Sequence, residues 1–333
     1  MSSILFCSAG RRGRLLLNAK QSLRERIEIV ATDNSATAPA LYFADKRYTV
    51  PKITSPEYID MIMSICDQNN VKAVTTLIDP EIEILAANAD VFRKRGIVTL
   101  FPEGETAKYC FNKYELFKYL SAKGINTPLT FHSLDDFKQS LRAQEIEFPV
   151  FIKPICGSGS VGAHRVEDME QLEKDWYSGE HDYIIQELMT EGDCDADVYV
   201  DTISHKPAAI FSKRKIETRI GGASKTISFK DEALFDFIRK ICEVFNFSGP
   251  LDMDFFMKDG EYYLSEINPR FGGAYLHAYG ANVDFFKLIE NNCNGIINKE
   301  CIGNYDDDIL MLMYDDVVIK HKDELVVGNF NIL

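Results

Sequence analysis

The chain has 333 residues, of which 46% are hydrophobic and 26% are charged, and its formal net charge is −14. This length exceeds what one hydrophobic core usually supports, so two or three packed subdomains are expected. The acidic balance argues against a nucleic-acid-binding protein, which normally carries a basic surface. It also means that an anionic ligand would need locally clustered cations and a metal ion.

Cysteine usage and hydropathy indicate the cellular compartment. The eight cysteines occur singly, from Cys7 to Cys301, without a CxxC pair, and the six histidines are equally scattered. We therefore expect neither a zinc site nor a disulfide framework, and eight free thiols suit a reducing cytoplasm. The first residues lack the features of a signal peptide, and no segment approaches the ~20 apolar residues of a membrane span. The sequence predicts a soluble, cytoplasmic protein.

The first hundred residues alternate between predicted strands and helices. Strands are expected at 4–7, 27–33, 71–78 and 97–101, and helices at 14–26, 58–69 and 81–95. Such alternation with short connections predicts a parallel, doubly wound α/β sheet. Ligands of these sheets bind beyond the carboxyl ends of the strands. We expect these ends to select the substrate, and their mixed charges suit an amino acid: Ser8 to Arg12, Asp33-Asn34 and Asp79 to Glu81.

The pattern changes after Pro102. Amphipathic helices are expected at 106–123 and 134–144, and strands predominate from 148 to about 263, interrupted by helices near 167–177 and 231–245. A helix at 275–291 and a strand-rich tail at 309–327 complete the chain. This α+β region is therefore distinct from the α/β region that precedes it.

A glycine-rich loop follows the predicted strand that ends at Lys153-Pro154. The sequence Gly157-Ser158-Gly159-Ser160-Val161-Gly162 matches GxGxxG, but a dinucleotide-binding fold needs a helix directly after the glycines. Here a short strand-like run follows, and the next helix begins near Asp168. The pattern predicts a hairpin flap whose backbone N–H groups can close over phosphates, with Lys153 adding a positive charge. A plain Gly/Ser hairpin turn is the alternative.

An acidic hairpin between residues 251 and 270 is the most informative segment. A three-residue loop at 258–260 would pair Asp254 with Leu264 and place Asp254 and Glu266 on one face. A two-residue loop would instead put these two carboxylates on opposite faces. The other face would be apolar and would contain Met253, Phe255, Tyr263 and Ile267.

Asn268 falls on the predicted acidic face of this hairpin. Two carboxylates and an amide oxygen form an all-oxygen site, which is the chemistry of Mg²⁺ that bridges phosphates. Arg270 lies two residues further on and could bind an anionic transferring group through both ends of its guanidinium. A solvated acidic face is the alternative in so acidic a chain. Pro269 favours a site because it ends the strand where a loop must project.

Together these motifs resemble the ATP-grasp superfamily, in particular carbamoyl-phosphate-synthase-like proteins with a single ATP-grasp module. The resemblance runs from residue 1 to about 290 and rests on the order and spacing of four motifs. They are Asn112-Lys113-Tyr114, Pro149-Val150-Phe151-Ile152-Lys153-Pro154 with its glycine loop, Ile185-Gln186-Glu187-Leu188, and Glu266-Ile267-Asn268-Pro269-Arg270. It implies an N-terminal parallel-sheet pre-ATP-grasp domain at 1–103 and a two-lobed ATP-grasp fold. Lobe A would span 104–185, and lobe B with the C-terminal strands would span 186–333.

The resemblance also implies an ATP site. Lys113 and Lys153 would contact the phosphates, and Glu187 with the backbone near Leu188 would bind adenine. The flap would contribute Gly157, Gly159, Ser160 and Gly162. An acidic residue should hold the ribose, and Asp193 and Asp195 are both candidates in place of the usual glutamate, with Asp193 fitting better without gaps.

The same resemblance implies the metal and catalytic residues. Asp254, Glu266 and Asn268 match the ligands of Mg²⁺, with Mn²⁺ as an alternative metal, and Arg270 matches the arginine that steadies an acyl phosphate. Lys153 and Arg270 are the expected catalytic residues. Arg214 and Arg219 would reach the γ-phosphate or the substrate, or else belong to a solvated basic strand.

The implied function is that of a free-standing ATP-dependent ligase. It would join a small-molecule carboxylate to an amine through an acyl phosphate. With length for one ATP-grasp half, the chain is not expected to make carbamoyl phosphate itself. The alternatives are a small-molecule kinase or carboxylase on the same fold and a non-catalytic nucleotide sensor, with a dehydrogenase as the weakest rival. We expect no nucleic-acid or membrane partner; the association state is open and includes a homodimer.

Overall fold

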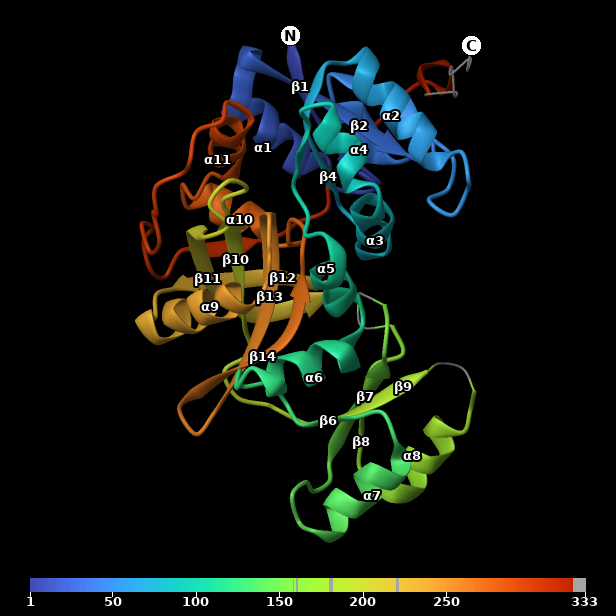
Figure 1. The fold of residues 1–333 in the computed structure, drawn as a ribbon, viewed down its shortest axis with the longest axis vertical. Coiled ribbons are helices and arrows are strands. Elements are labelled where there is room, and N and C mark those ends of the chain that lie inside the picture. Colours follow the sequence, from blue (N-terminus) through green and yellow to red (C-terminus); the bar gives the residue numbers. More distant parts are fainter. Residues whose placement is uncertain (158, 160, 180–181, 220–221, 326–333) are drawn as a thin grey trace.

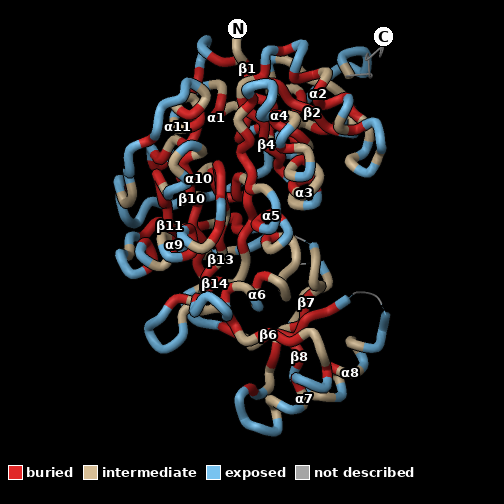
Figure 2. Tube along the Cα trace, in the orientation of Figure 1, coloured by how far each residue is buried: buried red, intermediate tan, exposed pale blue. Residues whose placement is uncertain are grey.

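A computed structural model of the protein describes residues 1–157, 159, 161–179, 182–219 and 222–325. Three sheets form the framework, and Figure 1 shows the N-terminal parallel sheet, the large antiparallel sheet and a small lobe arranged along the long axis. Burial is concentrated within the first two of these, and the small lobe has its own compact core (Figure 2).

The N-terminal sheet is parallel, with strand order β3-β2-β1-β4-β5, so the predicted α/β sheet is confirmed. Its strands are β1 (Ser2–Cys7), β2 (Ile27–Asp33), β3 (Lys46–Thr49), β4 (Val71–Thr76) and β5 (Val98–Thr99). Its helices are α1 (Gly13–Leu23), α2 (Tyr58–Gln68), α3 (Asp79–Ala87) and α4 (Ala89–Lys94), with short 3-10 turns η1 (Arg24–Arg26) and η2 (Pro39–Phe43).

Two details of this sheet differ from the prediction. The edge strand β3 was not predicted, because its four residues are all only half-buried and carry no apolar signal. The helix predicted at 81–95 is divided at Asn88, whose side-chain amide donates to the carbonyl of Ile84. This side chain competes with the backbone for a helical acceptor, which favours a helix end.

The small sheet has the order β6-β9-β7-β8. Its strands are β6 (Thr130–Phe131), β7 (Val150–Pro154), β8 (His164–Val166) and β9 (Tyr183–Glu187), covered by α7 (Leu134–Arg142) and α8 (Met169–Trp176). Because β7 and β8 pair in antiparallel fashion, the glycine loop is the tip of a hairpin, as predicted. The predicted lobe boundary at 185/186 falls inside β9, which pairs with β7 along its whole length.

A helix break introduces this lobe. Instead of one helix at 106–123 there are two, α5 (Gly104–Phe111) and α6 (Lys113–Ala122). Asn112 has extended backbone angles, and its side-chain oxygen accepts hydrogen bonds from the N–H groups of Tyr114 and Glu115. This N-cap fixes the start of α6 and places Lys113 in its first turn.

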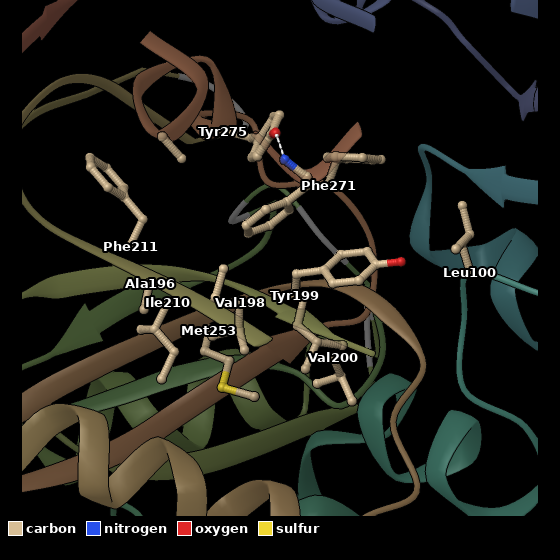
Figure 3. Close-up of a cluster of buried hydrophobic side chains, with 14 of the residues drawn as sticks. Leu100, Ala196, Val198, Tyr199, Val200, Ile210, Phe211, Met253, Phe271 and Tyr275 are labelled. Atoms are coloured by element: carbon tan, nitrogen blue, oxygen red, sulfur yellow. Dashed lines mark hydrogen bonds between the residues drawn. The ribbon is translucent and has the colours of Figure 1, made fainter. Parts of the chain in front are cut away.

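The large sheet is antiparallel, with order β14-β13-β10-β11-β12-β15. Its strands are β10 (Cys194–Val200), β11 (Pro207–Arg219), β12 (Gly222–Phe229), β13 (Gly249–Lys258), β14 (Glu261–Asn268) and β15 (Leu310–Leu312). One face packs against α9 (Glu232–Val244) through buried residues such as Val198, Ile210 and Met253 (Figure 3). The other face is apolar at one end, where Tyr199 lies near Phe271 and Tyr275 (Figure 3), and charged at the other.

The C-terminal region departs most from the prediction. The helix expected at 275–291 is two helices, α10 (Tyr275–Gly280) and α11 (Phe285–Cys293), separated at Asn282 with a φ of 69°. Of the strand-rich tail expected at 309–327, only β15 is a strand within the described residues, and η3 (Lys322–Glu324) is a 3-10 turn. None of the helices in the described ranges is long and apolar enough to cross a membrane.

Candidate functional site

The acidic hairpin of β13 and β14 has a tighter turn than predicted. Lys258 pairs with Glu261, so the loop contains two residues, Asp259 and Gly260, and not three. Both have positive φ, 52° and 79°, as a turn that matches the twist of a hairpin requires. Taken alone, this turn would place Asp254 and Glu266 on opposite faces.

A bulge restores the shared face. Phe255 pairs with Leu264, but the next pair is Asp254 with Glu266, so Ser265 has no opposite residue. The predicted pairing of Asp254 with Leu264 is therefore wrong, whereas the predicted common face of Asp254 and Glu266 is present. The prediction for the apolar face is also corrected. Between the bulge and the turn, this face contains Tyr262 and Leu264, both buried, in place of Tyr263.

The adjacent strand β10 extends the acidic pattern. Asp195 lies opposite Asp254, Asp197 lies opposite Asp252, and Asn268 lies opposite Asp252 from the other side. Residues directly opposite in antiparallel strands point to the same side of the sheet. Two rows of oxygen-bearing side chains thus run across three strands. We call this set the acidic face: Asp195, Asp197, Asp252, Asp254, Glu266 and Asn268.

Two lysines of β11 neutralise part of the acidic face. The Lys213 Nζ lies 2.5 Å from Asp197 Oδ2 and 3.0 Å from Asp195 Oδ1. The Lys215 Nζ lies 2.5 Å from Asp254 Oδ1. Burial lowers the pKa of Lys213, but the surrounding carboxylates outweigh burial and raise it, so this lysine stays charged.

Sequence reasoning chose the neighbouring arginines and missed these lysines. Arg214 points to the opposite side of the sheet, where its guanidinium lies 4.1 Å from the ring centre of Phe229. Arg219 is exposed and forms loose ion pairs with Glu217 and Asp315 at 3.6 and 3.8 Å. The available signal was the period-two alternation of a strand, which puts Lys213 and Lys215 together and Arg214 apart.

The acidic face is crowded with negative charge. Burial, followed by the charges of Asp254 and Asp195, raises the pKa of Asp252 to about 7. Burial also raises the pKa values of Asp195 and Asp197 to about 6, although Lys213 opposes this. Any cation that enters the site stabilises the charged form of these carboxylates.

Two further lysines lie near the acidic face, Lys153 in the small lobe and Lys113 at the start of α6. Lys153, on β7, is 7% exposed, and burial followed by the nearby charge of Lys113 lowers its pKa to about 8, although Glu266 opposes this. The Lys113 Nζ donates to the carbonyl of Gly157 at 2.7 Å and lies 3.6 Å from Glu266 Oε1. The Lys113 N–H donates to the carbonyl of Ile155, which fixes the start of the flap.

The flap itself depends on glycine conformations. Gly157, Gly159 and Gly162 have φ values of 125°, 72° and 76°, which side-chain-bearing residues rarely adopt. Ser160 lies outside the described residues. Gly157 lines a narrow pocket together with Asp79, Glu266, Asn268 and Pro269 and with apolar residues of α3 and α5.

Of the predicted adenine and ribose residues, Glu187 lies at the Lys258 end of β13, whereas Asp195 lies opposite Asp254. Glu187 ends β9, and its carboxylate pairs with Lys258, while Leu188 beside it is half-buried. Asp193 and Asp195 differ in access: the side chain of Asp193 is 43% exposed, whereas that of Asp195 is 7% exposed and is paired with Lys213. Only Asp193 therefore offers an accessible carboxylate.

Arg270 leaves β14 and contacts the N-terminal sheet. Its Nε lies 2.8 Å from Asp79 Oδ1 and its Nη2 donates to Asp79 Oδ2 at 3.0 Å, while Asp252 lies 3.6 Å from its Nη1. Arg12 donates to the carbonyls of Gly272 and Phe271 at 2.6 and 3.1 Å. Burial and the charge of Arg270 lower the pKa of Arg12 to about 10. From the sequence, Asp79 was expected only as part of a strand end that selects the substrate.

The other strand ends of the N-terminal sheet have structural partners. Asp33 accepts hydrogen bonds from the N–H groups of Gly10 and Ser35. Glu81 is fully buried and accepts hydrogen bonds from Tyr58 and Thr76, and burial raises its pKa to about 8. Of these strand-end carboxylates, Asp79 is the one that lines the pocket.

The residues present fit a divalent cation. Among the described residues, no three His, Cys, Asp or Glu side chains converge as a metal site, so a cation here would need the amide oxygen of Asn268 beside Asp254 and Glu266. Glu266 and Asn268 line the pocket and are therefore accessible to a ligand. Hard cations such as Mg²⁺ take this oxygen-only set and usually keep several waters.

Comparisons with known proteins agree with this architecture. A family profile described as an ATP-grasp domain matches residues 110–274, and one described as a PylC-like N-terminal domain matches residues 4–100. The formate-dependent phosphoribosylglycinamide formyltransferase of Hydrogenovibrio crunogenus is 23% identical over 286 residues, which cover 81% of this chain and 69% of that protein.

Two solved structures share the fold. The biotin carboxylase domain dimer of the Hydrogenobacter thermophilus 2-oxoglutarate carboxylase, in complex with MgADP, ADP and bicarbonate, has a TM-score of 0.71 and 16% identity, covering 92% of this chain and 73% of its own. The N5-carboxyaminoimidazole synthetase of Staphylococcus aureus, complexed with ADP, has a TM-score of 0.70 and 15% identity, covering 90% and 78%.

Proposed function

From the premise that this chain is a member of the ATP-grasp superfamily, we propose that it is an ATP-dependent carboxylate–amine ligase that works through an acyl phosphate. The observation that carries the proposal is the pairing of Asp254 with Glu266, which lies opposite Lys113 and Lys153 of the other lobe. Carboxylates on one side and lysines on the other are what a metal-bound triphosphate needs.

The order of residues along β13 supports one orientation of the nucleotide. Glu187 and Lys258 lie at one end, Asp193 comes next, and Asp254 lies four residues before Lys258, or ~14 Å at ~3.4 Å per residue. Adenine would bind at Glu187 and Leu188, the ribose at Asp193, and the phosphates near Asp254. Asp195 lies beside Asp254 and is proposed to belong with the metal ligands and not with the ribose.

Each site residue has a proposed task. Bound ATP with Mg²⁺ supplies the γ-phosphoryl group that activates the substrate carboxylate; Mn²⁺ would suit the same oxygen set. Asp254, Glu266 and Asn268 would hold the metal. Lys113 and Lys153 would bind the phosphates, and the flap, with Gly157, Gly159, Ser160 and Gly162, would exclude water from the reactive intermediate.

Arg270 is proposed to act on the acyl phosphate. The carboxylate oxygen bonds to the γ-phosphorus as ADP leaves, and the amine then bonds to the acyl carbon as phosphate leaves and the amine loses a proton. Asp79 binds the Nε–Nη2 edge of the Arg270 guanidinium, so the phosphoryl oxygens would be bound in a two-pronged contact by its Nη1–Nη2 edge. Because the pocket holding Asp79, Glu266 and Asn268 lies beside it, we propose that the carboxylate and the amine meet there.

The substrates are proposed to be small molecules. The name of the Hydrogenovibrio relative specifies formate as the carboxylate and transfer of a formyl group, which supports a small carboxylate here. Division into a pre-ATP-grasp domain at 1–103 and two lobes after it remains a proposal. A cytoplasmic location is also proposed, supported by eight cysteines that are all free thiols.

The test is ADP release by the purified protein with MgATP, pooled small carboxylates and pooled amines. We expect ADP release to require both pools, and hydroxylamine to replace the amine and give a hydroxamate. Release that yields a stable phosphorylated product without amine would indicate a kinase. Release that depends on bicarbonate would indicate a carboxylase. Nucleotide binding without turnover in any pool would indicate a sensor.

A further inference from the structure

The segment after β15 carries exposed apolar side chains. We call residues 313–321 the C-terminal strap. Tyr314, Val317 and Ile319 are 79%, 76% and 87% exposed, and Leu310 and Leu312 of β15 itself are 55% and 62% exposed. Scattered exposed apolar residues are ordinary, but a cluster of them in one short segment is typical of an interaction surface.

The strap has the composition of a strand but is paired with no strand in residues 1–325 as far as they are described. Residues 314–320 form no helix or strand, and in the part of the chain that the structure describes their backbone groups make no hydrogen bond to another backbone group. Val317, Val318 and Ile319 are β-branched and favour extended structure. The preceding strand β15 is an edge of the large sheet, so one side of it is also open.

The charges of the strap have a directional order. Asp315 and Asp316 precede the three β-branched residues, and Lys320, His321 and Lys322 follow them. If two copies pair in antiparallel fashion about Val318, Asp316 lies opposite Lys320 and Asp315 lies opposite His321. Val317 then lies opposite Ile319. Cross-strand pairs of opposite charge and of β-branched residues both stabilise a sheet.

We propose that the C-terminal strap is a homodimer contact in which two copies of this chain pair their straps as antiparallel strands about Val318. A parallel pairing in register would set Asp315 and Asp316 against their own copies and is unfavourable. The two-fold arrangement closes on itself, because each strap contacts only its equivalent. This proposal does not depend on the proposed chemistry, since the strap contains no site residue.

The expected association is weak to moderate. A two-stranded ribbon is marginal alone, and a stable interface usually buries about 800 Å² per partner. Leu310 and Leu312 would have to add to the contact. The ion pairs that the strap now makes do not hold it, because the Lys320 contact with Glu324 and the Asp315 contact with Arg219 are exposed.

The experiment uses two charge-reversed full-length chains. The first carries Asp315→Lys and Asp316→Lys, and the second carries Lys320→Glu and Lys322→Glu. In each variant both ends of the strap carry charge of the same sign, so two identical straps repel each other. Sedimentation velocity over a range of concentrations should therefore show a dimer for the natural chain and monomers for both variants. Mixed together, they should form a mixed dimer, because each strap then meets its opposite charge.

A matched control reverses two exposed carboxylates outside the strap, Glu25→Lys and Glu57→Lys. It should dimerise as the natural chain does. The proposal is overturned if the natural chain stays monomeric over a 100-fold range of protein concentrations. It is also overturned by a dimer that both variants retain, by open-ended polymers, or by variants that stay monomeric when mixed. Circular dichroism of each variant checks that the fold is intact.

Discussion

Two charge-rich regions of the molecule are built in different ways. On the acidic face, neighbouring strands of one sheet bring the charges together: Asp254 pairs with Asp195 on one side and with Glu266 on the other. At the junction with the N-terminal sheet, Asp79 and Arg270 meet although 191 residues separate them in sequence. The first arrangement depends on strand register, and the second depends on how two sheets pack.

The difference teaches where each region is vulnerable. The acidic face is over-determined, because Lys213 and Lys215 each contact two carboxylates and a lost partner leaves another. At the junction, Asp79 makes the two close contacts of Arg270, and Asp252 is farther away. We therefore expect substitutions of Glu266 and Asn268, the acidic-face residues that line the pocket, to change chemistry more than folding, and substitutions at the junction to change how Arg270 is held.

The largest effect is expected on the acidic face. Glu266→Gln or Asn268→Ala should reduce kcat by about 10²–10³, the usual loss when one preorganised charge-stabilising group is removed. For Glu266→Gln the melting temperature should change little, because the Glu266 side chain is partly exposed. Steady-state ADP release and thermal unfolding are measured on the same preparations, with Glu243→Gln, an exposed change on α9, as the control. Normal turnover with a lowered melting temperature would assign Glu266 a structural role.

Lys153 tests the opposite side of the same site. Lys153→Ala should lose about 10²-fold in kcat/KM, whereas Arg214→Ala, on the far side of the sheet, should stay close to the natural chain. Stopped assays on both variants at saturating and limiting ATP measure this. Equal losses in the two variants would contradict the assignment of Lys153 to the phosphates.

The pH dependence of nucleotide binding sharpens this prediction. The pKa of Lys153 is lowered to about 8 from its ordinary 10.5, so the folded chain releases this proton more readily than the unfolded chain does. Its contribution to folding stability therefore rises with pH between about 8 and 10.5. Nucleotide affinity should move the other way and fall above pH 8. Calorimetric titration should show this fall in the natural chain and lose it in Lys153→Ala.

Smaller effects are expected at the junction. Arg270→Ala should lower kcat and kcat/KM together while the ATP dissociation constant stays within a few fold, which is the pattern for a contact made in the transition state. Arg270→Lys should recover little, because an ammonium cannot reproduce the planar fork. Asp79→Asn should cost roughly 10-fold, since the guanidinium keeps its position less well. A large rise in the ATP dissociation constant would instead make Arg270 a nucleotide-binding residue.

The smallest effect separates the two ribose candidates. Asp193→Asn should raise the KM for ATP a few fold and leave unfolding unchanged, because its side chain is partly exposed. Asp195→Asn should lower stability, because it removes one carboxylate from the buried Lys213. Thermal unfolding and ATP titration of both variants are the measurements. The reverse pattern would transfer the ribose to Asp195.

Much of the site could be predicted because its residues lie close in sequence. Asp254, Glu266 and Asn268 belong to one hairpin, so alternation along two strands was enough to propose a common face. The predicted register was wrong, since a two-residue turn and a bulge replace a three-residue loop. The two errors cancel for Asp254 and Glu266 but not for Tyr263, which moves to the other face.

The sequence by itself determined the parallel N-terminal sheet, the hairpin flap and the residue types of the acidic face, because strand and helix periodicity and turn chemistry act over a few residues. Only the tertiary structure decided that Lys213 and Lys215 face the carboxylates, that Arg270 binds Asp79, and that the strap pairs with no strand among the described residues. The physical reason is that these contacts depend on which strands become neighbours and on how two sheets pack, and no local pattern encodes either of them.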